Sequence, residues 1–389
     1  MTEREAGTRH PSEHLMEIFL GGVPPLITTD LAKLEAQAAA TLSAEAYGYI
    51  VANAGNGATA RANRAAFDRW RLVPRMLRGV DKRNLGCEVL GTSMPAPIMI
   101  APVGVQTLAH PEGELATVRA AAKLGIPYIH SAAAAHSFEE VAEAGGDAPR
   151  WFQLYCVTDG DVHASFLRRA KAAGFSTLVV TVDTPMLGWR PSDINRAFQP
   201  FLRGLGLANY TSDPAFRAKL PESSDAGVAA ATHWAGMFPN PGLTWDGLSF
   251  LRRHWDGPVL LKGICAVDDA RRAADAGFDG IVVSNHGGRQ LDGAVAALDV
   301  LPEIADAVGS RMTVLFDSGV RTGVDVAKAL ALGARAVLLG RSFLYGLALD
   351  GQAGVEHVLR CTLAELDLTA ALSGHAGHQE LSPASMVFR

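Results

Sequence analysis

Short apolar runs alternate with Ala-rich helical patterns along most of the chain. Eight runs combine Ile, Leu, Val and aromatic residues, and they lie at 98–101, 126–131, 151–155, 177–183, 258–263, 280–284, 313–318 and 336–340. Helical patterns lie between or after them at 114–124, 138–144, 162–173, 245–254, 267–276, 298–308 and 323–332. Strands that are apolar throughout and are followed by helices indicate a parallel sheet that is buried on both faces.

Eight strand–helix units within about 250 residues predict an α/β fold of the (β/α)8 TIM-barrel type. The alternative is a doubly wound open sheet, which is disfavoured because no GxGxxG motif follows the first run. We therefore expect residues 98–389 to form the barrel.

Two segments lie outside the repeat. Residues 1–97 contain a helical stretch near 31–52 and a Gly/Asn-rich turn at 53–57, and we expect an N-terminal helical lead-in that packs on the barrel. The segment 185–242 follows the fourth strand and is far longer than the usual connection of about 2–6 residues. Its Phe, Leu and Tyr content predicts a lid at about 197–240.

Composition and charge narrow the class of protein. Hydrophobic residues make up 48% and charged residues 19% of the 389 residues, and no apolar run is long enough to span a membrane. The net charge of −5 argues against a nucleic-acid-binding protein, which would carry a basic surplus. The four cysteines form no CxxC pair and the N-terminus has no apolar signal segment, so we expect a cytoplasmic protein without a metal site.

The carboxyl ends of the strands form the active site in a TIM barrel. All eight ends in this sequence carry glycine or polar residues, which predicts recognition of a large polar ligand. In chain order they are Gly104, Ser131, Gln153 with Tyr155, Thr181 with Asp183, Lys262, Ser284 with His286 and Arg289, Asp317, and Gly340 with Arg341.

The last two units predict an anion site. The sequence DSGVRTG at 317–323 opens the seventh helix, and Gly340 and Arg341 follow the eighth strand. Glycines let backbone N–H groups approach an anion, a helix N-terminus adds its dipole, and Arg341 offers two parallel donors. Barrels often hold a phosphate at this place, and the alternative is that the glycines only make tight turns.

Four of these strand-end residues have the chemistry of a catalytic centre. Lys262 ends an apolar strand, so it could pair with a core carboxylate, form a Schiff base or stabilise negative charge on a ring. His286, in SNHGGRQ, is a candidate proton acceptor, and Arg289 beside it is a candidate carboxylate clamp. Asp183 could orient the imidazole or could simply cap a turn.

The chain resembles the FMN-dependent 2-hydroxy-acid oxidases and dehydrogenases from about residue 47 to residue 381. The motifs that carry the resemblance are AFDRWRLVPR (66–75), APVGVQTLAHPEGE (101–114), FQLY (152–155), TVDTP (181–185), LKGI (261–264), SNHGGRQLD (284–292), FDSGVRTG (316–323) and LGR (339–341). Within this family, MLGWRP (186–191), FLRGLGLANYTSDP (201–214) and Gly104 are most similar to the lactate 2-monooxygenase branch.

The resemblance implies FMN as the cofactor and a role for each strand-end residue. The flavin ring would contact Gly104, Ser131, Gln153, Thr181 and Lys262, and Ser284 would lie near the ribityl chain or the ring. The ribityl chain and phosphate would contact Asp317, Gly319, Arg321, Gly340 and Arg341. His286 would be the base, Asp183 its support, and Tyr155 the donor to the reacting oxygen. The substrate carboxylate or its neighbourhood would be bound by Tyr49, Arg190 and Arg289.

The resemblance also implies oxidation of a small L-2-hydroxy acid to the 2-oxo acid, with O2 as acceptor. A lactate 2-monooxygenase would convert L-lactate and O2 to acetate, CO2 and water. The alternative within the family is an oxidase that releases the 2-oxo acid and H2O2. A Schiff-base barrel lyase that acts on a phosphorylated substrate is the alternative from a different class. We further expect a homotetramer or homo-octamer, and a wide pocket beside Ala133.

Overall fold

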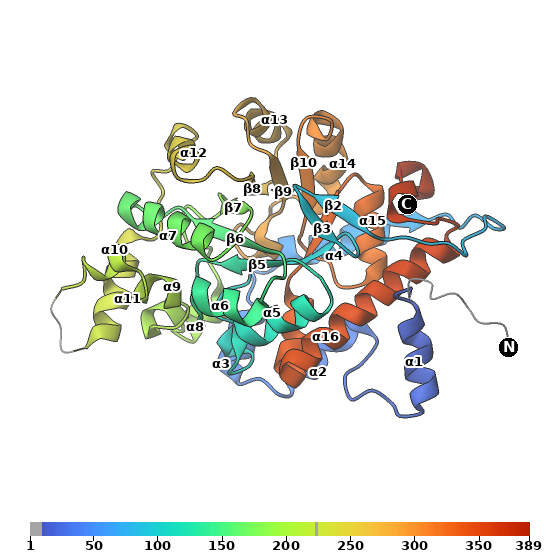
Figure 1. Cartoon of the computed structure of the whole chain (residues 1–389), viewed down its shortest axis with the longest axis horizontal. Helices are drawn as coiled ribbons and strands as arrows, with labels where there is room; N and C mark the ends of the chain where they lie inside the picture. Colours follow the sequence, from blue (N-terminus) through green and yellow to red (C-terminus); the bar gives the residue numbers. More distant parts are fainter. Residues whose placement is uncertain (1–9, 222–224) are drawn as a thin grey trace.

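The computed structural model describes residues 10–221 and 225–389, so part of the expected lead-in (1–9) and part of the expected lid (222–224) lie outside the described residues. Eight parallel strands close into a barrel (Figure 1). In chain order they are β4 (Ile98–Ile100), β5 (Tyr128–Ser131), β6 (Arg150–Tyr155), β7 (Leu178–Thr181), β8 (Val259–Ile264), β9 (Gly280–Val283), β10 (Thr313–Phe316) and β11 (Ala336–Leu339). Strand β11 pairs with β4 and closes the ring, so the predicted TIM barrel is confirmed.

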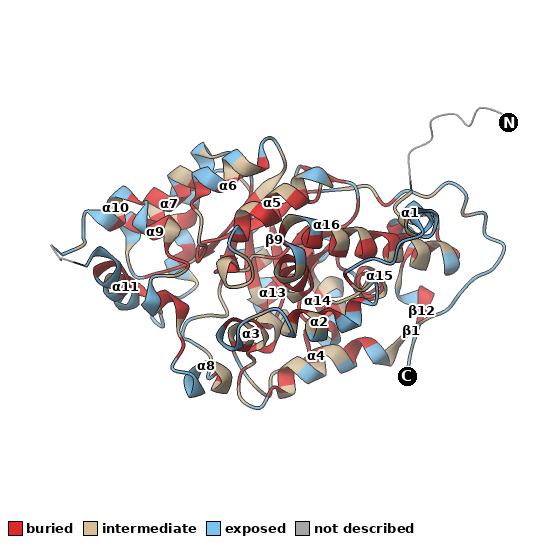
Figure 2. Ribbon diagram, turned by 90° about the horizontal axis from the view of Figure 1, so that it is seen from below, coloured by how far each residue is buried: buried red, intermediate tan, exposed pale blue. Residues whose placement is uncertain are grey.

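Side chains of the barrel strands alternate between the interior and the surrounding helices. The interior is filled by apolar side chains from all eight strands: Met99, Ile129, Trp151, Val179, Leu260, Val282, Leu315, Ala336 and Leu338. Neighbouring positions such as Leu261 and Ile281 join the larger core beneath the helices. Figure 2 shows these buried parts in red at the centre of the molecule.

The helices that follow the strands match six of the expected helical patterns. They are α5 (Gly113–Lys123), α6 (Phe138–Gly145), α7 (Gly160–Ala172), α13 (Val267–Asp275), α14 (Ala297–Val308) and α15 (Gly323–Ala331). The expected helix at 245–254 is instead the 3-10 turn η4 (Asp246–Phe250) followed by the short helix α12 (Leu251–His254). Thr244 Oγ1 accepts a hydrogen bond from the N–H of Gly247, and such a side-chain bond competes with helix formation.

A hairpin covers the amino end of the barrel. Strands β2 (Cys87–Val89) and β3 (Thr92–Met94) pair antiparallel, and Val89 and Met94 join the interior cluster. The indole Nε1 of Trp151 donates to Thr92 Oγ1 at 2.9 Å, which satisfies the polar atom of this fully buried side chain. This end of the barrel is therefore closed by packing.

The N-terminal segment contains α1 (Glu13–Gly21), η1 (Leu31–Lys33), α2 (Leu34–Ala39), α3 (Ala44–Val51) and α4 (Ala58–Arg69). The expected helical stretch at 31–52 is interrupted because Ser43 caps a new helix, with its Oγ accepting from the N–H of Ala46. After α4, strand β1 (Trp70–Leu72) pairs antiparallel with β12 (Met386–Phe388), so the residues after α4 contact the C-terminal residues.

The segment after β7 is folded into short helices. They are α8 (Pro191–Asn195), η3 (Pro200–Arg203), α9 (Ala208–Thr211), α10 (Pro214–Arg217) and α11 (Ala226–Met237). Trp234 of α11 packs its ring against Phe201, with centroids 4.7 Å apart, and against Phe238, with centroids 5.1 Å apart. These aromatic contacts tie the segment together over the carboxyl end of the barrel.

The last barrel strand leads into the long helix α16 (Arg341–Leu372), which the sequence pattern did not predict. It bends at Gly351, where a φ of 51° interrupts the helical backbone, and it packs against α5, α15, α2 and α1. The turns η2 (Gln106–Leu108), η5 (His286–Gly288), η6 (His378–Glu380) and η7 (Pro383–Ser385) complete the chain. Among the described residues, no helix has both the length and the apolar character needed to cross a membrane.

Candidate active site

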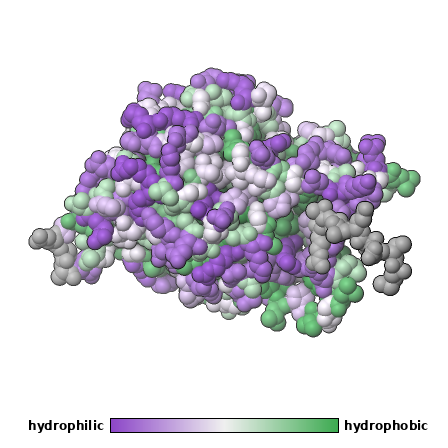
Figure 3. All heavy atoms as spheres, in the orientation of Figure 1, coloured by the Kyte–Doolittle hydropathy of each residue, from purple (hydrophilic) through white to green (hydrophobic). Residues whose placement is uncertain are grey.

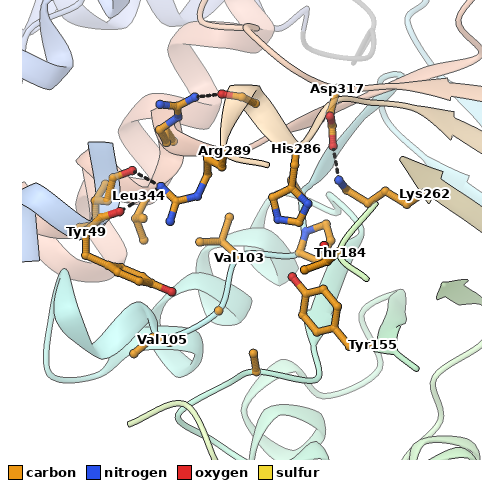
Figure 4. A pocket seen from close by; sticks show the side chains of 18 of the residues that line it. Tyr49, Val103, Val105, Tyr155, Thr184, Lys262, His286, Arg289, Asp317 and Leu344 are labelled. Carbon is orange, nitrogen blue, oxygen red and sulfur yellow. Dashed lines mark hydrogen bonds and ion pairs between the residues drawn. The ribbon is translucent and has the colours of Figure 1, made fainter. Parts of the chain in front are cut away.

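A cavity opens at the carboxyl ends of the barrel strands and contains about 1330 Å³ of space, its mouth included. Barrel loops, α3 and the segment after β7 all contribute to its wall (Figure 4). The wall contains most of the residues predicted for the site: Tyr49, Gly104, Tyr155, Arg190, Lys262, His286, Arg289, Asp317, Gly319, Arg321, Gly340 and Arg341. The other predicted residues contact this wall through hydrogen bonds or lie next to it in the barrel.

His286 is held at the wall by its own turn and by a carboxylate. It has a φ of 58°, a left-handed conformation that is strained for a residue with a side chain. Its backbone N–H donates to Ser284 Oγ at 3.1 Å. Its ring Nδ1 lies 2.9 Å from Oδ1 of Asp183, so the two residues predicted to act together are in contact.

Burial and this hydrogen bond set the protonation of the pair. Burial lowers the pKa of His286 below its ordinary value, because it outweighs the opposite effect of the Asp183 carboxylate. Burial would raise the pKa of Asp183, but His286 and Lys262 outweigh burial and hold that pKa below its ordinary value. With Nδ1–H donating to the carboxylate, Nε2 of the neutral imidazole has a lone pair that can accept a proton.

Tyr155 and Lys262 are further polar groups of the wall. Burial and the nearby carboxylate of Asp183 raise the pKa of Tyr155 to about 12, so its hydroxyl stays protonated and can donate a hydrogen bond. Lys262 Nζ lies 3.0 Å from Oδ2 of Asp317 and donates to Ser284 Oγ at 3.0 Å. Burial would lower the pKa of Lys262, but the carboxylates outweigh it, so the pKa is raised and the amine is charged.

A chain of hydrogen bonds crosses three neighbouring strands below the cavity. Ser131 Oγ of β5 donates to Gln153 Oε1 of β6 at 3.0 Å, and Gln153 Nε2 donates to Thr181 Oγ1 of β7 at 2.9 Å. All three side chains are buried, so each bond satisfies groups that would otherwise be desolvated without a partner. The arrangement fixes the orientation of the Gln153 amide at the strand ends.

Two arginines and a tyrosine form the side of the cavity next to α3. Nη1 of Arg289 donates to the carbonyls of Tyr49, Ile50 and Ala52 at 3.0, 3.2 and 2.7 Å. Among the described residues, no other nitrogen of this guanidinium group donates to a protein group. Arg190 Nε donates to the carbonyl of Arg289 at 2.9 Å. Burial lowers the pKa of Arg289 to about 10, so it remains cationic at neutral pH.

The predicted anion site lies where the chain leaves β10 and β11. Arg341 is the first residue of α16, and Arg321 lies two residues before α15, so guanidinium groups from these two neighbouring units line the cavity. Burial, followed by the proximity of Arg341, lowers the pKa of Arg321 to about 10. Arg321 donates only to the carbonyl of Val320 among the hydrogen bonds of its side chain to described residues. This arrangement suits an anionic ligand, which would neutralise both cations.

Residues 38–388 match the family model of FMN-dependent dehydrogenases. The chain belongs to this family. It is 48% identical over 354 residues to an FMN-dependent alpha-hydroxy acid dehydrogenase of Penicillium citrinum, a match that covers 90% of this chain and 88% of that protein. It is 44% identical over 359 residues to an L-lactate oxidase of Lysinibacillus sphaericus, with 92% of each chain covered. A solved structure of mandelate oxidase with (S)-4-hydroxymandelic acid has a TM-score of 0.83 and 40% identity, covering 93% of this chain and 99% of that one.

Membership in the FMN-dependent dehydrogenase family makes the protein an FMN-dependent oxidoreductase of 2-hydroxy acids, and the cavity fits that cofactor. In the described residues, no carboxylate is bonded to the guanidinium group of Arg321 or of Arg341. Both cations can therefore bind a phosphate group. Lys262 lines the same cavity, and its positive charge can stabilise an electron-rich ring. Because the family uses flavin chemistry and Lys262 is charged and paired, the Schiff-base lyase alternative does not apply.

Several residues of the site were missed in the sequence. The lid side chains Phe201, Tyr210, Trp234 and Phe238 line the same cavity as His286, and only their aromatic character indicated a lid. Ser318, which follows Asp317 with a φ of 85°, has an Oγ that accepts from the N–H groups of Asn285 and Gly287 and so supports the histidine turn. No spacing rule predicts this contact between two strand ends.

Gly104 lies close to the backbone that follows the neighbouring strand β5. In the structure, a Cβ at position 104 would lie 2.6 Å from the carbonyl oxygen of Ala133, which is closer than van der Waals contact. An alanine there would therefore displace the backbone that follows β4 or the backbone that follows β5.

Proposed function

We propose that the protein oxidises a small L-2-hydroxy acid with O2 as electron acceptor, and that it acts on L-lactate as a lactate 2-monooxygenase. The observation that carries this proposal is the shared wall of the cavity, where Phe201, Trp234 and Phe238 of the lid face the same space as His286. A closed lid keeps a product beside the groups that formed it. Retention of the 2-oxo acid favours its decarboxylation before release.

The chain's own residues would bind and orient the substrate. Arg289 and Arg190 supply positive charge for its carboxylate, and the Tyr155 hydroxyl can donate to its reacting oxygen. Holding the α-carbon in one position makes the reaction effectively unimolecular. Nε2 of His286 would accept a proton from the substrate. The Asp183 carboxylate would stabilise the imidazolium that results. FMN, when bound, supplies the acceptor for the two electrons.

The balance of the reaction distinguishes the two products. Oxidation of L-lactate releases two electrons and two protons, and O2 takes them up to give pyruvate and H2O2. If both stay in the cavity, pyruvate and H2O2 give acetate, CO2 and water. If pyruvate leaves first, the enzyme is an oxidase, the alternative that the L-lactate oxidase relative supports.

The deciding experiment is the ratio of acetate to pyruvate formed from L-lactate in air with catalase present. Catalase destroys free H2O2, so acetate can arise only from decarboxylation inside the cavity. Mainly acetate is expected. Mainly pyruvate would replace the monooxygenase proposal with the oxidase. Trp234→Ala, which removes the ring that packs on Phe201 and Phe238, should shift the ratio toward pyruvate.

The size of the substrate is a separate part of the proposal. Ala133 lies on the cavity wall, and its small side chain leaves room for a larger acid than lactate. The mandelate oxidase neighbour was solved with (S)-4-hydroxymandelic acid, an aromatic 2-hydroxy acid. L-lactate and (S)-mandelate should therefore be compared by kcat/KM, and a strong preference for mandelate would assign the pocket to aromatic acids.

Quaternary structure and compartment remain predictions. We expect a homotetramer or homo-octamer in the cytoplasm, which sedimentation of the purified holoenzyme and cell fractionation would test. A monomer in sedimentation would contradict the first expectation.

A further inference from the structure

A second group of reactive side chains lies outside the cavity, where α1 meets α16. His14 of α1 and His357 and Cys361 of α16 each bring one nitrogen or sulfur atom within 4.8 Å of the others. Figure 1 shows α1 in dark blue beside the red α16. None of the three residues lines the cavity described above, so the catalytic reaction does not account for their meeting.

The contact between α1 and the rest of the protein is mostly polar. No residue of α1 is buried, and Phe19 and Leu20 are 67% and 81% exposed. Figure 3 shows apolar side chains of this region exposed at the lower right of the molecule. The N-terminal end of α1 is held by the N–H of Ser12, which donates to Asp367 Oδ2 at 3.2 Å, and Glu17 lies 3.1 Å from Arg360. Hydrophobic packing therefore contributes little to holding this helix in place.

His14 is oriented like a histidine that binds a metal ion. Its Nδ1 lies 3.2 Å from Oε2 of Glu17, and a carboxylate there accepts a hydrogen bond only if Nδ1 carries the proton. Nε2 then has a free lone pair, and this atom is buried with no hydrogen-bond partner among the described residues. Metal-binding histidines commonly donate their other ring N–H to a carboxylate in this way.

The two residues of α16 supply the matching ligands. His357 and Cys361 are one helical turn apart, and Cys361 Sγ lies 3.5 Å from His357 Nε2. His357 Nε2 is also 3.3 Å from the carbonyl oxygen of Thr28, a contact that metal binding would replace. Two imidazole nitrogens and one thiolate are typical ligands of Zn²⁺ and unsuited to Mg²⁺ or Ca²⁺, which prefer oxygen.

We propose that His14, His357 and Cys361 bind one Zn²⁺ ion that joins α1 to α16, with water as the fourth ligand. On binding, the Cys361 thiol releases its proton to solvent and the sulfur bonds to the metal, so no group is oxidised or reduced. The proposed role of the ion is to join the two helices, and the site is independent of the flavin. The sequence predicted no metal site because His14 is separated from the other two by more than 300 residues, and only the His-x3-Cys spacing on α16 could have indicated it.

The test uses untagged holoenzyme, because a histidine tag would itself bind zinc. After dialysis against a chelator and removal of the chelator, ZnCl2 is titrated by calorimetry and the bound metal is counted by elemental analysis. One Zn²⁺ per chain is expected. X-ray absorption at the zinc edge should show a sulfur ligand at about 2.3 Å and nitrogen ligands at about 2.0–2.1 Å.

Matched variants identify the ligands. His14→Gln and Cys361→Ser should each weaken zinc binding at least about 100-fold, because loss even of an outer partner typically weakens a metal site 10–100-fold. His10→Gln and Cys87→Ser, which change the same residue types outside the cluster, should bind zinc like the wild type. The flavin spectrum reports whether each variant is folded, and His14→Gln removes no buried side chain.

A second measurement addresses the role of the metal. Zinc should slow amide hydrogen exchange of residues 13–21 in the wild type and should leave exchange in His14→Gln unchanged. The proposal is overturned if the stripped protein binds no zinc, if the absorption edge shows only oxygen and nitrogen ligands, or if the His14 and Cys361 variants bind as tightly as the wild type.

Discussion

The two ends of the barrel are built by the same eight strands but differ in chemistry. At the amino end, the hairpin β2–β3 covers an apolar interior that contains Leu260 and Leu315. Two residues further along the same strands, at the carboxyl end, are Lys262 and Asp317, which pair with each other. A spacing of two residues, about 7 Å, keeps a side chain on the same face of a strand. On these two strands, a residue that packs in the barrel interior is therefore only two positions away from a residue of the active site.

The two ends of the barrel contribute to different properties of the protein. Side chains at the amino end contribute to the free energy of unfolding, and those at the carboxyl end contribute to binding and rate. Substitutions at the two ends should therefore change different measurable quantities.

Replacement of His286 by Ala tests the chemical end. The substrate should reduce the bound FMN about 10²–10⁴-fold more slowly, because a positioned acid–base group contributes rate factors of that size. Anaerobic stopped-flow spectroscopy measures the rate of flavin reduction. An unchanged melting temperature of the holoenzyme would show that the substitution affects the active site and not the fold. His10→Gln is the matched control. Reduction at the wild-type rate in His286→Ala would assign the base to another group.

Replacement of Trp151 by Ala tests the packing end. Loss of this fully buried ring should lower the free energy of unfolding by about 3–5 kcal/mol. The rate of flavin reduction per folded molecule should change little. Urea denaturation measures the first quantity and stopped-flow spectroscopy the second. Trp189→Ala, at a side chain that is 71% exposed, should cost no more than about 0.5 kcal/mol. A large loss of rate in Trp151→Ala would show that the two ends are coupled.

Replacement of Arg289 by Lys keeps the charge but removes the planar fork of donors. Substrate binding should weaken about 10–100-fold, as expected for loss of a hydrogen bond between charged groups. The flavin spectrum should be unchanged, since Arg289 belongs to the substrate side of the cavity. Titration of the enzyme with the product 2-oxo acid gives the dissociation constant. Equal affinity in both enzymes would remove Arg289 from the carboxylate site.

The pH dependence of kcat/KM should show the smallest effect. This quantity reports the base of the free enzyme, which must be deprotonated to work. Burial lowers the pKa of His286 from its ordinary value of 6.5, so the rate constant should stay constant as the pH falls to 6.5 and decline only below it. An inflection above 6.5 would mean that the Asp183 carboxylate outweighs burial.

The sequence predicted the barrel and its strand ends well, for a physical reason. A strand that is buried on both faces must be apolar throughout, so each run was visible, and the first polar residue after it marked the carboxyl end. Lys262 and His286 were found in this way. The same logic fails where tertiary contacts decide the structure. The break at Ser43, the helices of the lid and the bend of α16 at Gly351 depend on single side chains or on distant partners.

The close approach of Arg321 and Arg341 also affects the newly made polypeptide before it meets its cofactor. Folding brings two like charges together in a poorly hydrated place, and an incoming phosphate relieves their repulsion. Flavin and folded protein are then linked by mass action, and each tenfold excess of free FMN over its dissociation constant adds about 1.4 kcal/mol to the stability of the native state. In a cell short of riboflavin, the apoprotein would spend more of its time unfolded and would be degraded faster, so vitamin supply would regulate the amount of enzyme without any change in transcription.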